Sequence, residues 1–161
     1  MTAPGESPTE RLAALGLTLP EVTRPLAAYV PAVRTGSYVY VSGQLPMIHG
    51  ELQATGKVGA QVDIERARAM ARICGLNALA AAAAAAGGLD AITRIVKVTG
   101  FVASSPDFTE QAQVVNGASE LFVEVFGEAG RHARSAVGMA VLPRDTPVEV
   151  ELIAEVAGEG A

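Results

Sequence analysis

The stretch DIERARAMARICGLNALAAAAAAAGG, residues 63–88, constrains the fold more than any other part of the sequence. Asp63 suits the N-cap of a helix, and the seven consecutive alanines from Ala80 to Ala86 have the highest helix propensity of all residues. Two glycines then suit its end. Since a face of alanines lets a helix lie close to a sheet or to another helix, the sequence predicts a long, tightly packed helix here.

Two further helices are predicted by capping signals and by helical spacing of apolar residues. In SPTERLAALG, Ser7 and Glu10 have the spacing of a capping box, which indicates a short N-terminal helix. The second long helix is expected within residues 105–130, where either Ser105 or Asp107 can serve as the N-cap.

Alternating apolar residues, separated by turn residues, predict five strands. They are expected at residues 29–33, 38–46, 92–104, 135–142 and 148–156. In the third strand, one face is expected to carry Ile95, Lys97 and Thr99, with Val98 on the other face. A short strand pair is expected around His49.

The order of strands, helix, strand, helix and two strands indicates an α+β fold. In such a fold two helices pack on one face of a mixed sheet. A length of 161 residues fits one domain, residues 1–161, with no internal repeat. We expect residues 1–6 and 157–161 to be flexible.

Composition argues against several classes of protein. The formal net charge is -5 and no run of basic residues is present, which is unfavourable for binding nucleic acid. The start of the chain lacks the pattern of a secretory signal, and the longest apolar run, Leu79 to Ala86, is too short to span a bilayer. We therefore expect a soluble cytoplasmic protein without a membrane partner.

The sequence offers no clear metal site or reactive thiol. His49 and His132 are far apart and lack the close ligand pairs typical of zinc sites. The single cysteine, Cys74, falls in the predicted long helix among small residues, where we expect it to be buried as a packing residue.

Arg134 stands at the entry of the strand predicted at 135–142, which we expect to be buried. An unpaired buried guanidinium group is too costly to keep, so Arg134 needs a partner. That partner can be a carboxylate of the chain, Glu149 or Glu151. It can also be the carboxylate of a ligand, which a guanidinium group grips with two parallel hydrogen bonds. The residues alone leave both alternatives open.

Three other positions have unusual residues for their predicted surroundings. Ser42 and Gly43 end a strand, where they form either an ordinary turn or a place where a ligand approaches the main chain. Asn116 precedes Gly117 inside a helix that both residues weaken. A reason other than helix propensity is therefore expected for this pair.

Four segments together resemble the Rid family, also called YjgF. They are YVPAVRTGSYVYVSGQLP, VVNGASELFVEVFG, RHARSAVGMAVLP and VEVELIAEV. The N-terminal helix and the long connections resemble the longer branch of the family, whose members often carry the label "putative endoribonuclease". The resemblance implies a chorismate-mutase-like fold and a homotrimer with a pocket at each subunit interface.

The resemblance also implies roles for residues of this chain. Arg134 would bind the carboxylate of a small imine or enamine acid, and Glu149 would lie close to the attacking water; these two are the expected catalytic residues. The expected pocket lining is Tyr29, Ser42, Gly43, Asn116 and Ala136. Ala136 departs from the compact deaminases, which commonly carry a cysteine there.

The implied reaction is the hydrolytic deamination of small 2-imino or enamino acids to 2-keto acids and ammonia, without a metal or other cofactor. One alternative is a non-catalytic trimer that binds small carboxylates or acts in regulation. A second is an endoribonuclease, which the acidic composition and the lack of a basic aromatic groove disfavour. In a third, Arg134 has a purely structural role and pairs with Glu149.

Overall fold

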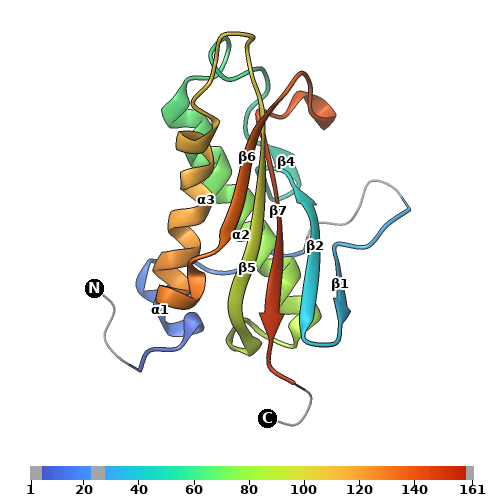
Figure 1. The fold of residues 1–161 in the computed structure, drawn as a ribbon, viewed down its shortest axis with the longest axis vertical. Coiled ribbons are helices and arrows are strands. Elements are labelled where there is room, and N and C mark those ends of the chain that lie inside the picture. The colour runs from blue at the N-terminus through green and yellow to red at the C-terminus, as the bar shows by residue number, and fades with distance from the viewer. Residues whose placement is uncertain (1–4, 23–27, 159–161) are drawn as a thin grey trace.

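The computed structural model describes residues 5–22 and 28–158, and it confirms the α+β prediction. Two long helices, α2 (Ile64–Ala86) and α3 (Gln111–Phe126), cover one face of a five-stranded sheet (Figure 1). The short helix α1 (Pro8–Ala14) lies beside α3. Most of the termini that we expected to be flexible lie outside the described residues.

The main sheet is mixed, with the strand order β1-β2-β7-β5-β6. Its strands are β1 (Ala32–Thr35), β2 (Tyr38–Gln44), β5 (Ile92–Ala103), β6 (Ala133–Met139) and β7 (Val148–Val156). β5 and β6 are parallel, and the other neighbouring pairs are antiparallel. The predicted short pair around His49 is the hairpin of β3 (Met47–Ile48) and β4 (Glu51–Leu52).

The ends of α1 and α2 follow the capping chemistry of the sequence. The Asp63 carboxylate accepts a hydrogen bond from the Arg66 amide at 2.8 Å, and α2 ends at Gly87, whose φ is 90°. The capping box of α1 is complete, because Ser7 and Glu10 each accept a bond from the other's amide.

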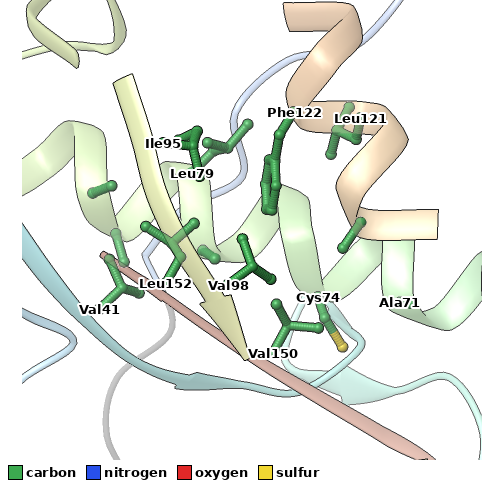
Figure 2. Packing of buried hydrophobic residues seen from close by; sticks show 14 of the residues in the cluster. Val41, Ala71, Cys74, Leu79, Ile95, Val98, Leu121, Phe122, Val150 and Leu152 are labelled. Carbon is green, nitrogen blue, oxygen red and sulfur yellow. The ribbon is translucent and has the colours of Figure 1, made fainter. Parts of the chain in front are cut away.

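The core lies between the sheet and the two long helices (Figure 2). Phe122 and Leu121 of α3 and Leu79 of α2 are fully buried there, together with sheet residues such as Val98. Most of the alanines of α2 are buried, as their small size predicted. By length and composition α2 could cross a membrane, but 67% of its most apolar 18-residue stretch is buried inside the fold.

The expected caps of α3 are wrong. The helix begins at Gln111, and its N-cap Glu110 makes no side-chain capping bond. Ser105 instead donates its hydroxyl hydrogen to the Asp107 carboxylate at 2.9 Å. The two polar side chains therefore satisfy each other in the loop before the helix.

The expected alternation along β5 is also wrong at Ile95. The pairing with β7 shifts register between Ile95 and Lys97, which gives β5 an extra residue at Val96. Ile95 consequently lies in the core with Val98, and not on the face of Lys97 and Thr99.

The prediction of a buried strand next to Arg134 is wrong. β6 is an edge strand with β5 as its one neighbour in the sheet, and none of its residues is buried. The sequence pattern Ala-Val-Gly-Met is apolar enough for a core strand, but strand order decides burial. β6 thus leaves Arg134 partly accessible.

Candidate functional site

The sheet separates the predicted site residues into two groups. The first, which we call the glutamate group, consists of Ser42, Gly43 and Glu149 on β2 and β7. The second, which we call the arginine group, consists of Arg134 and Ala136 on β6 and Asn116 on α3. Tyr29 belongs to neither group; it precedes β1 and is exposed.

The glutamate group forms where β2 bulges. The pairing of β2 with β7 shifts register between Val41 and Gln44, so Ser42 and Gly43 lie outside the regular ladder. The Glu149 side chain occupies the space beside Gly43. A Cβ atom built on Gly43 would lie 1.9 Å from Oε1 of Glu149. Glycine is therefore the residue that lets the carboxylate lie against the backbone of the bulge.

Ser42 connects this bulge to the segment that carries Tyr29. Its hydroxyl donates a hydrogen bond of 2.7 Å to the carbonyl oxygen of Val30, and its amide donates one of 2.9 Å to that of Pro31. Gln44 donates from its side chain to the Ser42 carbonyl at 3.1 Å. Ser42 thus fixes the chain next to Tyr29 relative to the position of Glu149.

Glu149 is half-buried, and this environment changes its acidity. Burial raises the pKa of the carboxyl group above its ordinary value, and the negative charge of Glu151 raises it further. A carboxyl group whose pKa moves toward the working pH is better suited to proton transfer than an exposed one. This environment thus gives Glu149 the properties of a carboxyl group that can exchange a proton.

The arginine group is held together by hydrogen bonds to α3. Arg134 donates from Nη1 to Oδ1 of Asn116 at 2.8 Å and to Oγ of Ser119 at 3.2 Å. It also donates from Nη2 to the carbonyl oxygen of Ala112 at 3.4 Å. This bond explains why an asparagine, a poor helix former, stands at position 116: its side chain holds the guanidinium group of Arg134.

None of the partners of Arg134 carries a charge. The three ion pairs found in residues 5–22 and 28–158 join Arg68 to Glu120, Arg72 to Glu124 and Arg131 to Glu128. In this part of the chain Arg134 has no ion pair with Glu149 or Glu151, so the pairing that the structural alternative expected is absent from the single chain. The positive charge of Arg134 is fixed in place but not neutralised.

Ala136 lies two residues further along β6, on the same face of the sheet as Arg134. In the parallel ladder, Arg134 pairs with Val98 and Ala136 pairs with Gly100. Ala136 is partly buried against the core. At this position the chain offers a methyl group and the backbone of an edge strand.

The glutamate and arginine groups face opposite sides of the sheet. Arg134 pairs with Val98, which is buried beneath the helices. Glu149 pairs with Phe101, on the alternate face of β5, and β5 separates β6 from β7. One chain therefore does not bring Arg134 and Glu149 into one pocket.

The sequence analysis missed Ser119, which contacts Arg134 directly, and gave His132 no role beyond excluding zinc. Ser119 follows Asn116 by three residues, and such residues share one face of a helix. That spacing was the one sequence signal that could have pointed to Ser119 as a neighbour of Asn116. Without the position of β6, however, nothing indicated which face of α3 would meet Arg134.

The described residues contain no group of three or more His, Cys, Asp or Glu side chains that could hold a metal ion. Cys74 is fully buried, as predicted, and its thiol contacts the Val148 carbonyl oxygen at 3.6 Å. Burial raises the pKa of this thiol well above its ordinary value, with a smaller contribution from the charge of Glu149. Cys74 is a packing residue in this fold.

Comparison with known proteins identifies relatives over nearly the whole chain. Residues 9–156 match the family model described as "YjgF/chorismate mutase-like, putative endoribonuclease". Protein TCP17 of Trypanosoma cruzi is 46% identical over 142 residues, which cover 88% of this chain and 89% of that protein. The crystal structure of Atu1372 from Agrobacterium tumefaciens, a protein with unknown function, is 49% identical, covers 93% of both chains and has a TM-score of 0.86.

A third relative carries a functional name. TdcF of Escherichia coli, named a "putative reactive intermediate deaminase", is 30% identical over 133 residues, or 80% of this chain and 87% of TdcF. Its crystal structure with bound serine has a TM-score of 0.63 and covers 85% of this chain and 94% of that chain.

Proposed function

The chain belongs to the YjgF/chorismate mutase-like family, and from this premise we propose that it hydrolyses small 2-imino or enamino acids to 2-keto acids and ammonia. The observation that carries the proposal is the state of Arg134. Neutral groups of Asn116, Ser119 and Ala112 hold its guanidinium group, and no carboxylate among the described residues neutralises it. The carboxylate of a substrate supplies that missing charge.

The pocket forms between subunits of a homotrimer. This part of the proposal rests on the family resemblance and on the separation of the two groups, since Arg134 of one subunit needs Glu149 of another. The sheet face that carries Glu149 also supports it. That face exposes four large apolar side chains outside the cover of the helices, namely Val33, Tyr38, Tyr40 and Val137. Exposed apolar side chains gathered on one face are typical of surfaces that pack against another protein.

The chemistry requires few groups, because the C=N carbon of an imine is already electrophilic. An enamino acid becomes the same kind of imine when its β-carbon gains a proton from solvent and its nitrogen loses one. Arg134 anchors the substrate carboxylate, and Glu149 accepts a proton from water as the water oxygen bonds to the C=N carbon. The nitrogen takes up protons, the C–N bond breaks, and ammonia leaves as the C=O bond of the keto acid forms. No step needs a metal or an organic cofactor.

The remaining predicted residues would position Arg134, Glu149 and the substrate. Gly43 leaves room for the Glu149 carboxylate, and Ser42 holds the segment that carries Tyr29. Tyr29 would close the pocket, and the backbone at Ala136 would hydrogen-bond the substrate. Asn116 would keep Arg134 in place.

The decisive experiment measures the hydrolysis of freshly generated 2-aminoacrylate and 2-iminobutyrate. The wild type is compared with Arg134→Ala and with a control, Arg131→Ala, which removes an exposed arginine from the same segment. Light scattering reports the oligomeric state of each variant. We expect the wild type and the control to accelerate hydrolysis, and the folded Arg134→Ala trimer to lose the acceleration.

Other outcomes separate the alternatives. Binding of 2-ketobutyrate by the wild type without any turnover would replace the deaminase with a carboxylate-binding trimer. A wild type that neither turns over nor binds these compounds would refute the proposed site. Cleavage of RNA that is lost in Arg134→Ala would support the endoribonuclease label of the family, against the acidic charge of this chain.

A further inference from the structure

Arg134 stands at one end of a chain of hydrogen bonds that runs through two residues outside the predicted site. Nδ1 of His132 lies 2.6 Å from the carbonyl oxygen of Gly130, and Nε2 lies 2.9 Å from Oγ of Ser119. Nη1 of Arg134 reaches the same Ser119 oxygen at 3.2 Å. These contacts connect the middle of α3, the turn after the helix and the start of β6.

The chemistry of the partners sets the direction of each bond. A carbonyl oxygen can only accept, so Nδ1 of His132 carries the hydrogen that bonds to Gly130. In a neutral ring Nε2 is then an acceptor, and the Ser119 hydroxyl donates to it. The lone pairs of Ser119 remain available for the N–H of Arg134. Every donor in this chain of bonds therefore has one acceptor.

The environment of His132 keeps the ring neutral and in place. Burial lowers the pKa of His132; the bond to Gly130 opposes this, and the nearby charge of Arg134 lowers the pKa further. The ring also packs edge to face against Phe122, with the centroids 5.7 Å apart and an angle of 75° between the planes. Since Phe122 is fully buried in the core, it gives the imidazole ring a rigid support.

We propose that Ser119 and His132 are positioning residues that fix the orientation of the Arg134 guanidinium group for a substrate carboxylate. The inference rests on the proposed function for the identity of the ligand, but its geometry stands without it. Asn116 and Ser119 both accept from Nη1, and two acceptors define the plane of the group better than one. His132 in turn fixes the Ser119 hydroxyl, because it takes the only hydrogen of that group.

The test compares Ser119→Ala, Ser119→Thr and His132→Phe with the wild type. Ser119→Ala removes the hydroxyl, Ser119→Thr retains it, and His132→Phe keeps an aromatic ring against Phe122 but cannot accept a bond. For imino acid hydrolysis we expect Ser119→Ala and His132→Phe to raise KM about tenfold or more with a smaller change in kcat, because misplaced anchoring groups weaken binding. We expect Ser119→Thr to restore most of the loss. Ser37→Ala, in an exposed turn, is the control.

A second measurement does not depend on any activity. Crystal structures of the wild type and of Ser119→Ala show directly where the guanidinium group lies. Displacement of Arg134 from Asn116 in the variant would support the proposal even if the wild type hydrolyses no imino acid. An unchanged Arg134 in the variant structure, or an unchanged KM in an active enzyme, would overturn it. If the wild type shows no deaminase activity, that result would contradict the proposed function and not the positioning roles of Ser119 and His132.

Discussion

The carboxylate of Glu149 lies so close to the backbone of Gly43 that a methyl group on Gly43 would come within 1.9 Å of Oε1. Two residues that are far apart in the sequence thus share one small volume at the bulge of β2. The contact ties the conformation of a candidate catalytic side chain to the absence of a side chain on the neighbouring strand. It also gives the Ser-Gly pair a role more specific than that of a turn.

Gly43→Ala should lower the activity and leave the protein folded. The new methyl group cannot coexist with the present Glu149 rotamer, but the obstructing atoms belong to a flexible side chain that can swing away. We expect a folded protein whose imino acid hydrolysis falls by about 100-fold, the lower range for losing a general base. Thermal unfolding and steady-state kinetics check this. Gly158→Ala, where a Cβ atom meets nothing within 4 Å, should retain full activity.

Asn116→Asp should weaken carboxylate binding without harming the fold. The aspartate keeps the oxygen that accepts from Nη1 of Arg134, but its charge neutralises the guanidinium group and repels a substrate carboxylate. We expect KM to rise at least about tenfold, a cost of about 1.4 kcal/mol in binding. Gln113→Glu adds the same charge on an exposed part of α3 and should change KM far less. Equal effects of the two variants would mean that only net charge matters.

Glu151→Gln should move the pH dependence of the reaction. The negative charge of Glu151 is the second cause, after burial, of the raised pKa of Glu149. Its removal lowers the pKa of Glu149 toward the ordinary value of 4.5. Since a general base acts in its deprotonated form, the acidic limb of the kcat profile should shift to lower pH. Glu155→Gln, further along β7, is the control, and an unshifted limb in Glu151→Gln would show that another group controls the rate.

Gly117→Ala should lower stability, although alanine is the better helix former by about 1 kcal/mol. A Cβ atom on Gly117 would lie 2.0 Å from the backbone carbonyl oxygen of Arg68, so α2 and α3 would have to move apart. We expect the free energy of unfolding to fall by about 1 to 3 kcal/mol, the usual cost of overpacking. Denaturant titration measures it. A gain in stability would show that the helices separate easily.

Local patterns in the sequence were sufficient for most of the secondary structure. The Asp63 cap, the alanine run and the following glycines determine α2, and the capping box determines α1, because these signals involve residues within a few positions of each other. The caps of α3 could not be predicted, since Ser105 and Asp107 satisfy each other before the helix begins.

The candidate site could be predicted only as a set of residues. The resemblance pointed to Arg134 and Glu149, but it did not reveal that they face opposite sides of the sheet in one chain. That arrangement depends on which strand lies between β6 and β7, and on the register in which each of them pairs with that strand. No pattern within a single strand contains this information.

The sequence by itself thus determined which segments become helices and strands, because short-range hydrogen bonding and the period of apolar residues decide this locally. Only the tertiary structure decided that β6 is an edge strand, that Asn116 and Ser119 hold Arg134 while His132 bonds to Ser119, and that Glu149 lies against Gly43. These relationships arise from strand order, register and the packing of α3. They join residues that are distant in the chain, and a side chain has neither a partner nor a pKa shift until that packing forms.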